Sequence, residues 1–131
     1  MSDSQVSSLP VGSPQARAGS ASKIYRGRRK YGMTARVTVN RRPLNPRRDL
    51  WSHWPGGFEW SYGGSGPAQL ALALLADHLG DDERAVRLHQ EFKWAVVARL
   101  PHHGWDLTSW EIDEAVALLE GEIAVEEALN I

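Results

Sequence analysis

The sequence predicts a single α+β domain, in which a small N-terminal antiparallel sheet of about three strands is packed by three C-terminal helices. Two patterns predict this fold: apolar and polar residues alternate in the N-terminal half, and apolar residues follow helical spacing after residue 65. The chain has 131 residues, 42% of them hydrophobic, which is enough for a core without disulfides. We expect one domain over residues 23–121, between a disordered tail at 1–22 and an acidic tail at 122–131.

The strands are expected over residues 24–31, 35–40 and 58–62. The second segment, ARVTVN, alternates apolar with polar residues, which is typical of a half-buried strand. The third segment, FEWSY, alternates aromatic with polar residues and would be the last strand. We expect its aromatic side chains to share the buried face of the sheet.

The helices are expected over residues 67–79, about 82–99 and about 108–121. The first opens on a proline, and its Ala/Leu composition predicts burial on all sides. Thr108 and the glutamate three residues later form a capping box for the last helix. Gly121 marks the expected end of that helix.

A net charge of −1 conceals a polarised chain. Residues 1–60 hold eleven Lys/Arg and three Asp/Glu, whereas residues 61–131 hold four and thirteen. Such asymmetry is consistent with a nucleic-acid-binding face, with a basic sheet neutralised by acidic helices, or with a homo-oligomer of copies that associate head to tail.

Cysteine content and hydropathy indicate the cellular compartment in which we expect the protein. The chain has no cysteine, which fits a reducing cytosol and excludes thiolate metal sites and cysteine nucleophiles. No apolar run reaches the ~18–20 residues of a membrane span. We therefore expect a cytoplasmic protein that does not bind a membrane.

The stretch GFEWSYGGSGPAQLALALLADHLGD at residues 57–81 is distinctive. It resembles an uncharacterised bacterial domain family of unknown function, marked by the motif GFEWxYGGSGPAQLALA, whose small members are often carried on plasmids, integrative elements and phages. The other segments that share the resemblance are residues 25–28, 37–44, 92–93 and 105–108. The resemblance spans residues 23–119 and implies a mobile-element or host-defence setting, where small proteins are often inhibitors or modulators. It transfers no catalytic residue.

The loop Gly63, Gly64, Ser65 and Gly66 lies between an expected strand and a helix N-terminus. Backbone N–H groups can converge on an anion at such a place, and Gln69 in the first helical turn could reach the same point. The loop lacks the lysine of nucleotide-hydrolase phosphate loops and the dinucleotide fingerprint. Alternatively, the glycines only permit a sharp reversal into a buried helix.

Basic and tryptophan residues of the N-terminal half form a second candidate site, for a protein partner or a nucleic acid. They are Arg28, Arg29, Lys30, Arg41, Arg42, Arg47, Arg48, Trp51 and Trp54. Arginine donates forked hydrogen bonds to phosphate and carboxylate, and tryptophan is enriched at interface hot spots. The tryptophans could instead close the open edge of the core, and a pI near 6.5 is low for a nucleic-acid-binding domain.

No group of residues in the sequence has the spacing of a known catalytic or metal site. Glu59, between two aromatic residues, could be a buried acid or base, or could pair with an arginine across the sheet. We therefore expect no metal and no cofactor, and a non-enzymatic interaction protein that docks on a protein or protein–nucleic acid complex through its basic half. The alternatives are direct nucleic-acid binding and a phosphate- or nucleotide-binding enzyme that uses the glycine loop.

Overall fold

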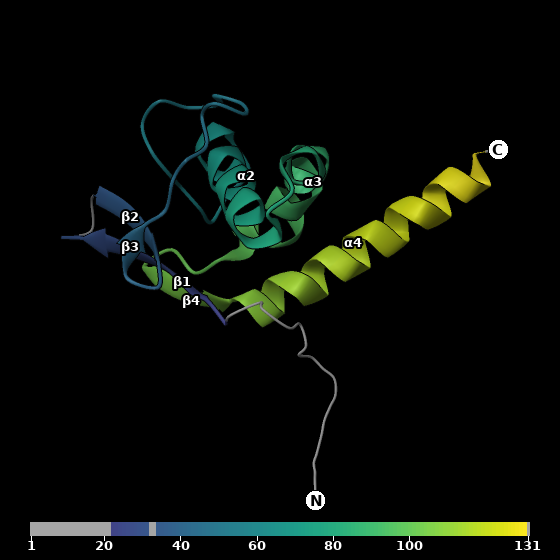
Figure 1. Ribbon diagram of the computed structural model, residues 1–131. Helices are drawn as coiled ribbons and strands as arrows, with labels where there is room; N and C mark the ends of the chain where they lie inside the picture. Colours follow the sequence, from purple (N-terminus) through teal and green to yellow (C-terminus); the bar gives the residue numbers. More distant parts are fainter. Residues whose placement is uncertain (1–21, 32–33, 131) are drawn as a thin grey trace, which may run out of the picture.

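The computed structural model describes residues 22–31 and 34–130. Within them, four antiparallel strands form one sheet next to three α-helices and a short 3-10 helix, which confirms the predicted α+β class (Figure 1). The strands in sheet order are β3 (Arg42–Pro43), β2 (Thr34–Val39), β1 (Ile24–Lys30) and β4 (Gly104–Thr108). The helices are α2 (Ser65–Leu79), α3 (Asp82–Ala95), η1 (Val97–Arg99) and α4 (Ser109–Leu129). The expected disordered tail, apart from its last residue, lies outside the described residues.

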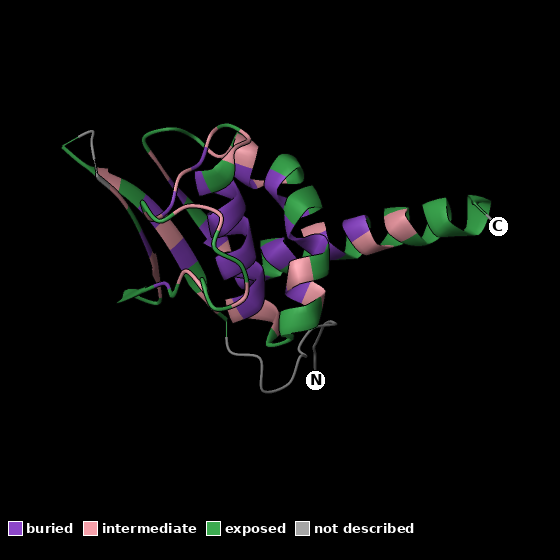
Figure 2. Cartoon of the chain, turned by 90° about the horizontal axis from the view of Figure 1, so that it is seen from above, coloured by how far each residue is buried: buried purple, intermediate pink, exposed green. Residues whose placement is uncertain are grey.

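The sheet is built on β1, which pairs with β2 along one edge and with β4 along the other. Because side chains alternate along a strand, Tyr25 and Gly27 are buried, whereas Arg26 is partly buried and Arg28 is exposed. Figure 2 shows the helices gathered on a single side of the sheet. The sheet therefore has one face in the core and one open face.

The predicted strand at residues 58–62 is wrong: these residues belong to no strand, and β4 is the strand that pairs with β1 on the side away from β2. The Nε1–H of Trp60 donates to the carbonyl of His102 at 2.9 Å, and the N–H of Ser61 donates to the carbonyl of Val97 at 3.1 Å. The segment is thus bonded to η1 and to the connection between η1 and β4 instead of to a strand. Phe58 and Trp60 are still buried, as their alternation predicted, whereas Tyr62 is exposed.

Helix α2 lies at the centre of the core, and its predicted burial on all sides is confirmed from Gly66 to Ala76. It ends at Gly80, whose φ of 64° lies in the left-handed region and whose N–H bonds the carbonyl of Ala76. The next helix stops earlier than the sequence predicted, at Ala95, and η1 replaces its last turn. The core thus rests on one almost wholly apolar helix between the sheet and α3.

Helix α4 begins with the predicted capping box between Thr108 and Glu111. Its expected end at Gly121 is wrong, because the helix continues to Leu129 through the residues assigned to an acidic tail. One glycine costs a helix interior only about 1 kcal/mol, and the Glu, Ile, Ala and Val residues that follow are compatible with helix. None of the described helices is long and apolar enough to cross a membrane.

Candidate functional site

The open face of the sheet carries a cluster of cationic side chains that we call the basic face. Its members are Arg26, Arg28, Lys30 and Arg36. Arg28 lies directly opposite Arg36 in the pairing of β1 with β2, so both project to the same side. The only acidic residue in the described strands is Asp106 of β4, opposite Arg26. The basic face therefore carries a net positive charge at neutral pH.

Asp106 neutralises the side of the basic face nearest β4. Its carboxylate accepts a hydrogen bond from Arg28 at 2.7 Å and lies 3.6 Å from Nε of Arg26. The hydrogen bond from Arg28 lowers the pKa of this carboxyl, so that it stays ionised at neutral pH. Lys30 and Arg36, by contrast, are exposed and form no ion pair with any described residue. They are the free cations of the basic face.

Arg41 and Arg42 extend the positive charge to the β2–β3 hairpin. Asn40 and Arg41 form its tight turn with φ of 47° and 73°, both in the left-handed region that two-residue hairpin turns require. Both arginines are exposed, and neither pairs with a carboxylate of the described chain. The structure thus keeps these two candidate residues available to a partner.

Arg29 belongs to the opposite face and is used inside the molecule. Its side chain is 6% exposed, and it donates to Oε1 of Glu59 at 2.8 Å and to the carbonyl of His102 at 2.8 Å. Its guanidinium carbon also lies 4.4 Å from the centroid of the Trp60 ring. The sequence allows two roles for Glu59, a buried acid or base and an ion-pair partner of an arginine, and the structure shows the ion pair. Arg29 joins β1 to segment 58–62 and has little surface to offer a partner.

Arg47 and Arg48 hold the long connection between β3 and α2. The guanidinium of Arg47 lies 3.0 Å from Asp49 and 2.9 Å from Asp82 at the start of α3, so it pairs with both carboxylates. Its hydrogen bonds lower the pKa of the Asp49 carboxyl. Arg48 donates to the carbonyl of Pro55 at 3.0 Å. Both guanidinium groups therefore stabilise the connection.

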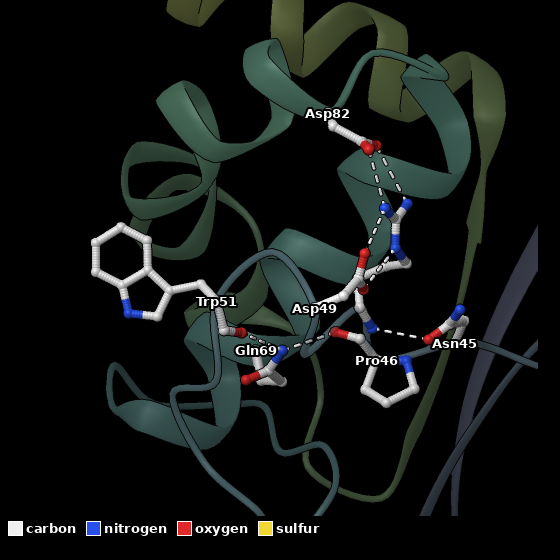
Figure 3. Close-up of polar contacts among 7 residues, drawn as sticks. Asn45, Pro46, Asp49, Trp51, Gln69 and Asp82 are labelled. Atoms are coloured by element: carbon white, nitrogen blue, oxygen red, sulfur yellow. Dashed lines mark hydrogen bonds and ion pairs between the residues drawn. The ribbon is translucent and has the colours of Figure 1, made fainter.

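Gln69 is fully buried and serves the same connection. Its amide nitrogen donates to the carbonyls of Pro46 at 2.7 Å and Trp51 at 3.0 Å (Figure 3), and its oxygen accepts from the N–H of His53 at 2.7 Å. Every polar atom of this side chain has a backbone partner. Gln69 thus fixes the path of the chain before α2, and the structure gives it no free group for an anion.

The three glycines of the loop 63–66 are packed against aromatic rings. A Cβ on Gly63 would lie 2.2 Å from the Trp94 ring, and a Cβ on Gly66 would lie 2.8 Å from the side chain of Glu59 and 2.9 Å from Trp54. None of the three has a positive φ. Close packing therefore explains these glycines and favours the interpretation that they permit a sharp reversal into a buried helix. Anion binding at the helix N-terminus stays a prediction.

Sequence reasoning missed a contact between His53 and His89, whose Nε2 atoms lie 2.9 Å apart. Because Nδ1 of His89 lies 2.6 Å from the carbonyl of Val86, Nδ1 carries the proton, and Nε2 of His89 accepts from His53. Burial lowers the pKa of both imidazoles. Trp51 stacks on His53 at 4.9 Å and stays half exposed, so it both covers this pair and offers an aromatic surface.

No metal centre is evident in the part of the chain that the structure describes, since no three His, Cys, Asp or Glu side chains come together there. Trp54, the last of the candidate residues, is partly buried against Gly66. The candidate set thus divides into residues that are open to a partner and residues that hold the fold. The open ones are Lys30, Arg41, Arg42 and Trp51, whereas Arg28 is exposed but bonded to Asp106 and to the carbonyl of Trp105.

Comparison with known proteins identifies one family. A sequence profile described as a family of unknown function, DUF6166, matches residues 25–118. That segment contains the basic face and the loop 63–66, and it stops within α4. No curated protein and no solved structure matches the chain.

Proposed function

The chain belongs to family DUF6166, whose description assigns no activity, and we propose from its own residues that it is a non-enzymatic binding protein that docks on an acidic partner through the basic face. The observation that carries the proposal is an open sheet face with four cations and one carboxylate. Two of the cations, Lys30 and Arg36, form no ion pair with a described residue. Charge complementarity of this kind accelerates encounter and selects the partner.

The sheet holds these charges at a fixed spacing. Residues two apart on one strand are separated by roughly 7 Å, and directly opposite residues on paired strands by roughly 5 Å. The strand backbones are fixed by their ladder of hydrogen bonds, so Arg28, Lys30 and Arg36 lose little backbone freedom when a partner binds. A surface that carries carboxylates at similar spacing would fit this array.

An acidic protein surface fits the basic face better than a nucleic acid does. Proteins that bind single strands stack bases on aromatic side chains, and the outward positions of the described strands carry none. Helix α4 adds seven Asp/Glu and no Lys/Arg, which would repel a long polyanion. We therefore favour a protein, alone or within a protein–nucleic acid complex. Direct nucleic-acid binding is the alternative that the experiments must separate.

The proposal also states the cellular compartment and the genetic context in which the protein acts. We place the protein in the bacterial cytosol, as its cysteine-free sequence predicts, and in the mobile-element or host-defence context that its family resemblance implies. A small binding protein without a catalytic group acts there by occupying the surface of a host protein. Its role would be that of an inhibitor or modulator.

Photo-cross-linking in cells tests the docking face. A benzophenone amino acid at Thr38, on the outer side of β2 opposite Arg26, should capture a protein with an acidic surface. The double variant Lys30→Glu/Arg36→Glu should abolish the product, whereas Arg99→Glu, a charge reversal at an exposed site in η1, should leave it intact. The proposal fails if the product persists in the double variant, or if it forms equally from a benzophenone at the exposed Gln90 of α3.

Oligonucleotide titrations decide between the two kinds of partner. Direct nucleic-acid binding predicts an affinity that falls between about 50 and 200 mM salt with a log–log slope of ~0.9 per phosphate contacted. We expect no such binding for single- or double-stranded DNA or RNA. A steep salt slope that disappears in Lys30→Glu/Arg36→Glu would replace the docking proposal with the alternative.

A further inference from the structure

Helix α4 carries an apolar side that the rest of the described chain leaves uncovered. Leu118, Val125 and Leu129 are 69%, 60% and 81% exposed. Their spacing of seven and four residues places them along one side of the helix. A different stripe, which includes Val116 and Leu119, is buried against the body of the protein. The helix thus has a second apolar stripe that is mostly exposed in the described structure.

The uncovered stripe continues where α4 leaves the body. Leu119 is the last buried residue of the helix, which runs on to Leu129. Both Figure 1 and Figure 2 show this C-terminal part extending clear of the other elements. A short helix without tertiary packing is only marginally stable in water. Covering this stripe would therefore stabilise the end of α4.

The stripe lines a shallow groove of about 810 Å³ along α4, to which α3 contributes a single residue. Leu119 and Ile123 supply apolar surface on the side nearest the body, and Glu91 contributes from α3. Glu122 and Glu126 lie along the same groove and are exposed. The groove is therefore apolar and acidic at once.

These acids have no compensating charge in the described structure. Glu91, Glu122 and Glu126 form no ion pair with a described residue, whereas Glu120 of the same helix pairs with Arg84 at 2.7 Å. The whole of α4 holds seven Asp/Glu and no Lys/Arg. In the described structure, therefore, no apolar surface covers the exposed side chains of the groove and no cation pairs with its glutamates.

We propose that this groove binds an amphipathic helix of a partner protein, with one apolar side and Lys or Arg along its flanks. Such a helix would cover Leu118, Val125 and Leu129 and would pair with Glu122 and Glu126. Charge complementarity selects this occupant. It is independent of the acidic partner of the basic face, because the two surfaces have opposite charge and lie on different elements.

Other occupants fit the groove less well. The α4 helix of a second copy would bring seven acids against seven, which opposes pairing. The basic face of a second copy offers mainly charged and polar side chains, so it would leave the leucines and Val125 uncovered. A membrane with anionic lipids would be repelled by the acids of α4.

A fluorescent helical peptide of about 18 residues, with leucine on one side and lysine on the other, is the probe for anisotropy titrations of the full chain. We expect saturable binding, and no binding of the same peptide with glutamate in place of lysine. The variant Leu118→Ser/Val125→Ser/Leu129→Ser should lose at least about tenfold in affinity. Because all three side chains are exposed, the variant should keep the circular dichroism of the native fold.

A matched pair of charge reversals tests the electrostatic part. Glu122→Lys should weaken peptide binding, whereas Glu127→Lys, which lies in a separate hollow on the other side of α4 with Arg87, should not. Lys30→Glu/Arg36→Glu should leave peptide binding unchanged, which separates this inference from the docking role of the basic face. Absence of peptide binding, equal effects of Glu122→Lys and Glu127→Lys, or dimerisation of the chain that the triple serine variant abolishes would each overturn the proposal.

Discussion

Replacement of Arg29 by methionine should destabilise the fold strongly, although Arg29 stands among other arginines that face solvent. Arg29→Met keeps a long unbranched stem and removes the guanidinium that Glu59 and the carbonyl of His102 share. Breaking a buried ion pair by removing one partner costs ~3–5 kcal/mol, because the remaining charge is left unpaired. Glu59 is 22% exposed and keeps some access to water, so we take the lower end, ~3 kcal/mol.

Chemical denaturation followed by tryptophan fluorescence measures this loss, and a thermal melt should fall by ~12 °C for a domain of about 100 residues. The matched control is Arg28→Met on the same strand, whose partner Asp106 is half exposed. Solvent screens that pair, so its loss should cost much less. A double-mutant cycle of Arg29→Met with Glu59→Gln should give a coupling energy of at least ~1 kcal/mol. If Arg29→Met were no more destabilising than Arg28→Met, the internal role of Arg29 would be refuted.

Three further predictions concern the core and the histidine pair. Gly27→Ala should cost ~1–3 kcal/mol and change the near-UV circular dichroism, because the new Cβ would lie 2.3 Å from the buried Trp105 ring; an unchanged spectrum would contradict this. Ala71→Leu should destabilise by ~1–3 kcal/mol in thermal melts, since Ala71 is fully buried; an unchanged melting temperature would show that its surroundings have room. Burial lowers the pKa of His53 and His89 in the folded state, so the unfolded chain binds protons first as the pH falls. The stability present above pH ~6.5 should therefore decline below it, and denaturant titrations should show a weaker decline for His89→Gln.

Local patterns predicted those parts of the fold whose causes lie within a few residues of chain. The period of two at residues 35–40 predicted the half-buried β2, and Thr108 with Glu111 predicted the start of α4. Helix α2 ends at Gly80 because glycine adopts the left-handed backbone conformation at little cost in free energy. Even the burial of Arg29 has a local signal, since it follows the buried Tyr25 and Gly27 at the same strand period.

The sequence by itself thus determined the α+β class, the main helices and the polarity of charge along the chain. Only the tertiary structure decided which segment completes the sheet, because β4 pairs with β1 across about 80 residues, whereas residues 58–62 join no strand. It likewise decided which cations stay free: Arg29 meets Glu59, whereas Arg36 meets no described carboxylate. Periodicity orients a side chain toward core or solvent, but the partner it meets there depends on the register of distant segments.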